Sequence, residues 1–312
     1  MVNTSALVGK HILRTDLLSD AELELILSTA SRFENALQTG RRLTNMDGQI
    51  LATLFFEPST RTRLSFEAAM HRLGGQVVTM ADPQSSSTAK GESLADSVRT
   101  VEQYADVIVI RHPRKGSAQE AADAVQVPVI NAGDGTGQHP TQALLDVYTI
   151  RKEKGSLQGL TVALCGDLKN GRTVHSLTYL LARFGIRLLF VSPPGLEMPA
   201  ELTADLKKMG VDVTEGNDLA AAMRESDLVY VTRIQRERFA DPAEYDRLKG
   251  SYVLDMEMIR QAKPGITVMH PLPRVDEIAG EVDAYQGAAY FRQVANGVPI
   301  RMALLALVTG RA

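Results

Sequence analysis

The chain has 312 residues, of which 44% are hydrophobic and 23% are charged, and its formal net charge is -3. This length allows two domains of ordinary size, each with its own core. A net charge so close to zero creates no field that would attract nucleic acid, so an anionic ligand would have to be bound by local clusters of Arg and Lys.

The single cysteine, Cys165, excludes an internal disulfide framework and every metal site built from several cysteines. The six histidines show no His-Glu-x-x-His or comparable spacing, so we expect no metal and no other cofactor. Residues 1–10 lack the apolar stretch of a secretory signal. No apolar run approaches the roughly 20 residues that cross a bilayer. These features predict a cytoplasmic protein without membrane or nucleic-acid partners.

From residue 50 onward, short apolar runs alternate with segments whose apolar residues recur at helical spacing. Continuous apolar runs are typical of strands buried on both faces. The predicted strands are Ile50–Phe56, Gln76–Met80, Val107–Ile110, Val127–Ile130, Thr161–Cys165, Arg187–Val191, Leu228–Val231 and Thr267–Met269. The predicted helices include Leu64–Leu73, Leu94–Tyr104, Thr141–Lys154 and Val174–Phe184. This alternation predicts an α/β fold of doubly wound domains, each with a mainly parallel sheet flanked by helices.

A domain boundary is predicted in the polar, glycine-bearing stretch 151–159, which follows a long helix and precedes a new strand. We therefore expect one domain at residues 1–150 and a second at residues 151–312. The apolar segment Pro299–Val308 predicts a last helix, at about residues 296–309, that closes back on the first domain.

The loop after the first predicted strand is the most distinctive, because functional loops of parallel sheets lie at the carboxyl ends of strands. Ser59 stands at a predicted helix N-cap, and Thr60–Arg63 form the first turn. Free N–H groups and the positive end of the helix dipole favour an anion there, and the hydroxyl and guanidinium groups suit a phosphate. The alternative is that Ser59 only caps the helix while Arg63 pairs with Glu67.

Other predicted strand ends also carry polar candidates. Arg111 ends a strand, and His139 with Gln142 opens a helix after a glycine-rich turn. The segment His270-Pro-Leu-Pro273 leaves backbone carbonyls, rather than N–H groups, to meet a ligand. Lys90 ends a serine-rich loop. For each of these residues a passive role, as a cap or a solvated side chain, is the alternative.

The segment 166–173 is a near miss to the nucleotide P-loop, with Arg172 where a lysine belongs and Asp167 positioned to repel a polyphosphate. We prefer a carboxylate ligand for Arg172, because a guanidinium binds a carboxylate bidentately. Nucleotide binding and a solvated Arg172 are the alternatives. Arg233 and Gln235 point to one side of an extended segment and suit the same ligand, with a solvated basic loop as the alternative. Without a serine elbow or a Cys-x-x-Cys pair, an enzyme with these loops would act by positioning and electrostatics.

Four of these motifs together resemble the carbamoyltransferase family, namely Ser59-Thr-Arg-Thr-Arg63, Arg111-His-Pro113, His139-Pro-Thr-Gln142 and His270-Pro-Leu-Pro273. The resemblance covers essentially the whole chain, in order and at the expected separations. Within the family the chain looks like the branch that uses aspartate, because Pro271 stands where ornithine enzymes typically carry cysteine. Arg172 and Arg233 also suit a dicarboxylate and would repel the cationic ornithine.

The resemblance implies roles for particular residues. Carbamoyl phosphate would be bound by Ser59, Thr60, Arg61, Thr62, Arg111, His139, Gln142 and the carbonyls of Pro271 and Leu272, with Arg61, Thr62, Arg111 and His139 catalytic. L-Aspartate would be bound by Lys90, Arg172, Arg233 and Gln235. The implied reaction is attack of the aspartate α-amine on the carbamoyl carbon, which gives N-carbamoyl-L-aspartate and phosphate in pyrimidine synthesis. The leaving phosphate is the hypothetical acceptor of the amine proton.

The resemblance also implies a homotrimer with shared active sites, in which Lys90 and either Ser86 or Ser87 reach a neighbouring subunit. It leaves open a larger assembly with regulatory or dihydroorotase chains. Two alternatives stand beside the aspartate activity. The chain could be a carbamoyltransferase for another amino acid, such as ornithine, or a catalytically silent paralogue that binds phosphate compounds or serves as a scaffold.

Overall fold

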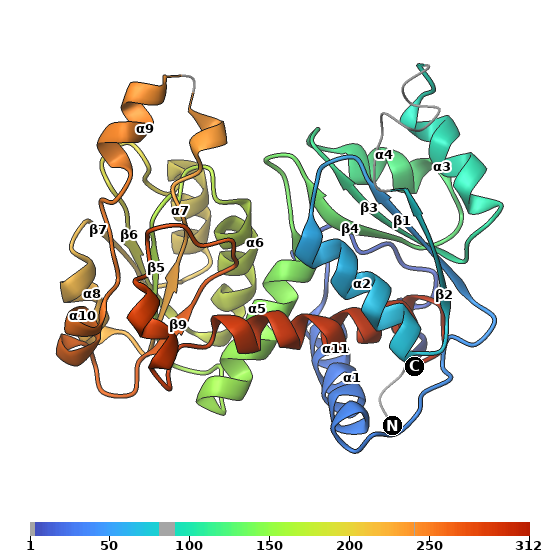
Figure 1. Cartoon of the computed structure of the whole chain (residues 1–312), viewed down its shortest axis with the longest axis horizontal. Coiled ribbons are helices and arrows are strands. Elements are labelled where there is room, and N and C mark those ends of the chain that lie inside the picture. The colour runs from blue at the N-terminus through green and yellow to red at the C-terminus, as the bar shows by residue number, and fades with distance from the viewer. Residues whose placement is uncertain (1–3, 81–90, 240) are drawn as a thin grey trace. The chain divides into compact units, whose positions relative to one another are not determined.

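The computed structural model describes residues 4–80, 91–239 and 241–312. Packing divides the chain into two compact units (Figure 1). The first unit is Met1–Leu145 with Ala295–Ala312, and the second is Asp146–Val294. The division falls within two helices, α5 (Pro140–Lys154) and α11 (Tyr290–Val308). The placement of ligand-binding domains at 1–150 and 151–312 stays a prediction, because packing units and binding domains need not share a boundary.

The first unit contains one parallel sheet with the strand order β2-β1-β3-β4. Its strands are β1 (Ile50–Phe55), β2 (Gln76–Met80), β3 (Val107–His112) and β4 (Val129–Asp134). Its other helices are η1 (Thr4–Leu7), α1 (Asp20–Gln38), α2 (Thr60–Arg72), α3 (Leu94–Glu102) and α4 (Ser117–Ala124). Right-handed crossovers place α2 on one face of this sheet and α3 with α4 on the other, as Figure 1 shows.

Side chains of the sheet alternate between two cores. Ala52 and Leu54 of β1 pack with Ile108 and Ile110 of β3 against the α3 and α4 face. Helix α2 contacts β1 and β2 and buries Phe66. Burial on both faces explains why these strands have continuous apolar sequences.

The part of the last helix from Ala295 onward packs within the first unit, as predicted. Val308 accepts a 2.8 Å hydrogen bond from the N–H of Gly9, and Arg301 donates a 3.0 Å hydrogen bond to Ser65 of α2. Helix α11 begins at Tyr290, earlier than the predicted start at about residue 296. The prediction missed its first turns because they contain Arg292 and Gln293, ahead of the more apolar segment on which the prediction rested.

The second unit contains a parallel sheet with the strand order β7-β6-β5-β8-β9. The strands are β5 (Thr161–Cys165), β6 (Arg187–Val191), β7 (Val213–Gly216), β8 (Leu228–Val231) and β9 (Thr267–Met269). The helices are α6 (Arg172–Leu181), η4 (Ala182–Phe184), α7 (Ala200–Lys208), α8 (Leu219–Glu225), η5 (Arg236–Arg238), α9 (Pro242–Leu248), α10 (Met256–Gln261) and η6 (Gly280–Ala284). The predicted α/β class, with two parallel sheets flanked by helices, is confirmed.

Each sheet has one point at which the chain reverses its winding direction. In the first unit this point lies between β1 and β3, and in the second it lies between β5 and β8. At such a switch point the two following loops run to opposite faces, and ligands bind in the crevice that they leave. The loops and helix starts after these strands, together with Arg111 at the end of β3, hold most of the predicted site residues. No helix in the described part of the chain is long and apolar enough to span a membrane.

Candidate active site

The loop after β1 leads directly into the start of α2. Ser59 occupies the N-cap in an extended conformation, but its side chain makes no capping hydrogen bond. The first turn of α2 contains no acidic residue. Thr60 and Arg61 are exposed, whereas Thr62 is only 6% exposed. Two hydroxyls and a guanidinium therefore lie beside the open N–H groups of a helix, which is a suitable arrangement for a phosphate.

Arg63 pairs with Glu67, which was the alternative that the sequence left open. Its Nε lies 3.7 Å from Oε1 of Glu67, one helical turn further on. This i,i+4 pair offsets part of the charge of Arg63, but it is too long for a hydrogen bond and leaves Nε without a hydrogen-bond partner. Arg61, which is exposed in the first turn, stays the candidate for contact with an anion.

Arg111 lies at the end of β3, next to β1 across the switch point. It is in register with Phe55, so the ladder sets it beside the loop that carries Ser59. Its side chain is 12% exposed, and its Nη2 lies 2.5 Å from Oε1 of Glu57. Glu57 was not singled out from the sequence. Its carboxylate orients the guanidinium of Arg111 and offsets part of its charge.

His139 and Gln142 are delivered by the loop that follows β4. The buried Asp134 organises this loop, because its carboxylate accepts hydrogen bonds from the N–H groups of Gly116 at 2.8 Å and Gln138 at 2.7 Å. His139 is 4% exposed at the start of α5, and Gln142 is half-buried in its first turn. Sequence reasoning missed Asp134, although an aspartate in a glycine-rich turn is a signal for this kind of capping.

In the second unit, the loop after β5 is shaped by Asp167. This carboxylate is fully buried and accepts hydrogen bonds from the backbone and side-chain nitrogens of Asn170 at 3.0 and 3.1 Å. Asp167 is thus engaged inside the loop rather than pointed at a ligand. Arg172, half-buried, then begins α6.

The loop after β8 lies against the loop after β5, since the Gln235 side chain donates a 3.2 Å hydrogen bond to the carbonyl of Asn170. Arg233 is half-buried on the wall of a pocket that Gly166, Lys249 and Asp276 also line. Arg172, Arg233 and Gln235 therefore belong to two adjoining loops at one switch point. Guanidinium and amide donors gathered in this way suit a small carboxylate ligand.

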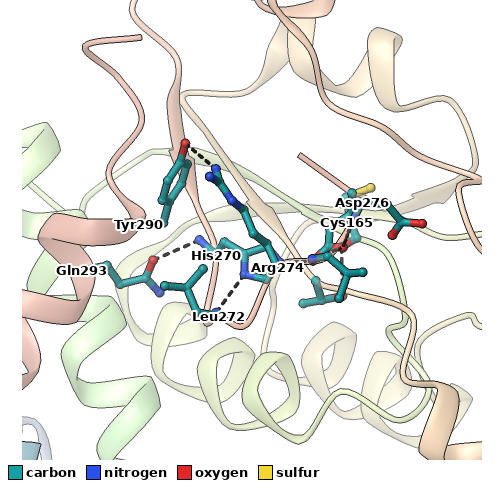
Figure 2. Close-up of polar contacts among 10 residues, drawn as sticks. Cys165, His270, Leu272, Arg274, Asp276, Tyr290 and Gln293 are labelled. Carbon is teal, nitrogen blue, oxygen red and sulfur yellow. Dashed lines mark hydrogen bonds and ion pairs between the residues drawn. The ribbon is translucent and has the colours of Figure 1, made fainter. Parts of the chain in front are cut away.

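The loop after β9 contains Pro271 and Leu272, both half-buried. Leu272 has a φ of 55° and is followed by a cis peptide bond to Pro273. Figure 2 shows Leu272 linked to the ring of His270. Because proline lacks an N–H, the polar backbone groups of the Pro271 segment are mainly acceptors.

Each described candidate residue thus lies at a carboxyl end of a strand or at the helix start that follows one. The predicted aspartate ligand Lys90 and the serines Ser86 and Ser87 lie outside the described residues. Within the described ranges, no cluster of three or more His, Cys, Asp or Glu side chains could hold a metal ion.

Comparison with known proteins identifies two adjacent family matches. Residues 10–152 match the carbamoyl-P binding domain of aspartate/ornithine carbamoyltransferase, and residues 158–308 match its Asp/Orn binding domain. The aspartate carbamoyltransferase catalytic subunit of Thermococcus gammatolerans is 55% identical over 97% of this chain and 98% of its own length.

Solved structures agree with these matches. Aspartate transcarbamoylase from Trypanosoma cruzi, in complex with carbamoyl phosphate and aspartate, superposes with a TM-score of 0.93 at 44% identity and covers 98% of both chains. The catalytic subunit of M. jannaschii aspartate transcarbamoylase gives a TM-score of 0.89 at 49% identity, over 95% of this chain and 97% of that one. Two family domains in the correct order, together with near-complete coverage at this identity, establish that the chain belongs to the aspartate/ornithine carbamoyltransferase family.

Proposed function

We propose that this chain is an aspartate carbamoyltransferase, which transfers the carbamoyl group of carbamoyl phosphate to the α-amine of L-aspartate. The products are N-carbamoyl-L-aspartate and inorganic phosphate, in the synthesis of pyrimidines. The observation that carries the proposal is that arginine side chains lie at both switch points, with Arg61 and Arg111 at one and Arg172 and Arg233 at the other. The aspartate activity of relatives that match almost the whole chain supports it.

The phosphate of carbamoyl phosphate is assigned to the start of α2. Ser59, Thr60, Arg61 and Thr62 would donate to its oxygens, with Arg111 reaching both phosphate and carbonyl oxygen. His139 and Thr62 would polarise the carbonyl, so that these donors stabilise the charge that develops in the transition state. Since Glu57 already holds Arg111, the guanidinium is oriented before the substrate arrives.

The carbamoyl amide and aspartate require opposite kinds of groups. The amide is a donor, and it is assigned to the acceptor oxygens of Gln142, Pro271 and Leu272. The carboxylates of aspartate are assigned to Arg172, Arg233, Gln235 and Lys90, of which Lys90 lies outside the described residues.

The reaction forms one bond and breaks one. The lone pair of the aspartate nitrogen attacks the carbamoyl carbon, the bond to the phosphate oxygen breaks, and the amine proton passes to the leaving phosphate. No protein nucleophile takes part. The chain would accelerate this step by holding two anions in reactive geometry, which is a large contribution for a bimolecular reaction.

We further propose that the chain is cytoplasmic and assembles as a homotrimer, with sites completed by Lys90 and by Ser86 or Ser87 of a neighbouring subunit. The description of a 55% identical relative as a catalytic subunit supports an assembly of several chains. Regulatory or dihydroorotase chains are candidates for further partners.

The test is a comparison of product formation with aspartate and with ornithine as acceptor. We expect carbamoylaspartate from aspartate and a rate near background with ornithine. Arg61→Ala should lower kcat/KM by about 100-fold or more, which is the usual loss when a transition-state donor is removed. Arg42→Ala, which removes an exposed arginine from the same unit, is the matched control and should be unaffected. Product from ornithine, or full activity in a folded Arg61→Ala variant, would refute the proposal.

A further inference from the structure

Leu272 has an unusual backbone conformation for its residue type. Among the described residues it is the non-glycine residue with a positive φ, at 55°. The left-handed region is disfavoured for a side chain that carries a Cβ, so it persists only where neighbouring groups hold it. The proposed function assigns a carbonyl of this residue to the carbamoyl amide.

The imidazole of His270 holds Leu272 from within the same loop. The N–H of Leu272 donates a 2.8 Å hydrogen bond to Nδ1 of His270, which is 1% exposed. An Nδ1 that accepts carries no proton, so the proton of the neutral ring lies on Nε2. That Nε2 lies 2.6 Å from Oε1 of Glu277.

Glu277 fixes this tautomer. Burial raises the pKa of Glu277, but hydrogen bonds from His270 and from backbone N–H groups outweigh that effect and leave the pKa below its ordinary value. The side chain therefore stays a carboxylate, which can only accept from Nε2. Its second oxygen accepts hydrogen bonds of 3.1 Å from the N–H groups of Val275 and Asp276. One carboxylate thus ties both ends of the loop together.

The backbone of His270 is held independently. Its N–H donates a 3.0 Å hydrogen bond to Oε1 of Gln293, and Figure 2 shows His270 linked to both Gln293 and Leu272. Gln293 in turn donates to the buried Asp146 at 2.6 Å, and Tyr230 donates to the other oxygen of Asp146 at 2.8 Å. Because its backbone and its ring are both held by hydrogen bonds, His270 anchors the two residues that follow it.

We infer that Glu277, acting through His270, is a positioning residue that aims the carbonyls of Pro271 and Leu272 at the carbamoyl amide. Its carboxylate selects the Nε2–H tautomer, the tautomer leaves Nδ1 free to accept, and that acceptor holds Leu272 in the left-handed conformation. In this role Glu277 and His270, which are 6% and 1% exposed, act through the two carbonyls rather than by contact with the carbamoyl amide. This role rests on the proposed function, which assigns those two carbonyls to the amide.

Three substitutions separate the two hydrogen bonds of the His270 ring. His270→Asn keeps an oxygen near the position of Nδ1, so it retains an acceptor for Leu272 but loses the link to Glu277. His270→Gln keeps a donor near the position of Nε2 for Glu277 but loses the acceptor. The amide of Glu277→Gln can donate to Nε2, which shifts the ring proton to Nδ1. Two donors, Nδ1–H and the N–H of Leu272, then face each other. Glu257→Gln makes the same change at an exposed glutamate of the same unit and is the control.

The measurement compares inorganic phosphate with phosphonoacetamide, a stable phosphonate that keeps the carboxamide, by titration calorimetry of the full-length protein. Phosphate lacks the group that the two carbonyls would bind. We expect His270→Gln and Glu277→Gln to weaken phosphonoacetamide binding about 10-fold, the effect of losing an aligned polar contact of about 1.4 kcal/mol, and to lower kcat for aspartate. Phosphate affinity should stay within about twofold, and His270→Asn should retain most of the phosphonoacetamide affinity.

Three results would overturn the positioning role. They are unchanged phosphonoacetamide binding in the folded variants, an equal loss of phosphate and phosphonoacetamide affinity, and equal behaviour of His270→Asn and His270→Gln. If Glu277→Gln does not fold, the two His270 variants decide the question, and failure of all three to fold assigns the network a purely structural role. Wild-type activity on aspartate is measured first, so a failure of the proposed function is recognised separately.

Discussion

At the residue scale, charged side chains near the two switch points serve different purposes. Asp134 and Asp167 are buried, and each accepts hydrogen bonds from N–H groups of its own loop. Both use their charge to fix a loop rather than to face a ligand. Glu57, by contrast, pairs with Arg111 at 2.5 Å and so affects a candidate ligand-binding side chain directly. The sign of the charge on a residue in such a loop therefore indicates a ligand only after the partner of that residue is known.

Cys165 provides a test of burial at this scale. The thiol is completely buried in the core of the second unit, and burial raises its pKa. Because the thiolate is the reactive form, we expect the native protein to resist Ellman's reagent and to release the equivalent of its single thiol only after denaturation. Rapid stoichiometric modification of the native protein, with an unchanged circular dichroism spectrum, would contradict this expectation.

At this scale the sequence predicts local structure only as far as local pattern reaches, and the roles of the site residues stay predictions. The start of α2 was readable because Ser59 to Arg63 are contiguous and helix-end chemistry is local. The pairing of Gln293 with Asp146 joins residues 147 positions apart, and nothing near either residue in the sequence indicates the other. The hydrogen bonds that hold the Pro271 loop could therefore not be predicted from the sequence, although the loop itself was.

At the element scale, the strands that were predicted with correct bounds are those whose apolar sequence ends where the ladder ends, such as β5 and β8. Strand β3 continues through Arg111 and His112, beyond the predicted end at Ile110. These polar residues stay in the ladder because backbone hydrogen bonds do not depend on side-chain polarity. Strand β7 was missed because three of its four residues are exposed and give no hydrophobic pattern.

A substitution at Gly166 would test how closely the backbones that follow β5 and β8 approach each other. Gly166 has a φ of +113°, and a Cβ added there would lie 2.1 Å from the carbonyl oxygen of Thr232. Gly166→Ala should therefore lower the free energy of unfolding by about 3 kcal/mol or more, through both strain and a clash with backbone. Urea denaturation monitored by circular dichroism would measure the loss.

Gly185→Ala is the matched control for this prediction. Gly185 also has a positive φ, at +59°, but nothing lies within 4 Å of the position of an added Cβ. Its substitution should therefore cost only the conformational term of about 1 kcal/mol. Equal losses for the two variants would show that the contact with Thr232 relaxes without cost.

At the scale of the whole molecule, both sheets present their candidate binding loops at the same feature, a reversal of strand order. The order could not be predicted from the sequence, because it depends on which strands pair across long separations. The position of the loops could be predicted, because parallel strands bring their carboxyl ends to one edge. The family resemblance supplied the proposed substrates, and the proposed trimer places part of each site on a neighbouring chain.

A shared site makes a quantitative prediction about mixed trimers. Arg61→Ala and Lys90→Ala should each be nearly inactive alone, since each removes one contribution from every site. In a trimer that contains both variants, cyclic symmetry creates one site with a native Arg61 from one subunit and a native Lys90 from its neighbour. An equal mixture, dissociated and reassembled at random, should therefore recover about a quarter of the wild-type activity.

The control for this experiment mixes Lys90→Ala with the Lys90→Ala/Arg61→Ala double variant. No arrangement of these two chains can restore a native pair, so activity should stay at background even where mixed trimers form. Native mass spectrometry of differently tagged subunits would verify mixing and should show assemblies of about 100 kDa, three times the 33.9 kDa chain. If mixed trimers are present and the first mixture gains no activity, Arg61 and Lys90 act within one subunit, because only a site confined to one chain fails to benefit from a neighbour.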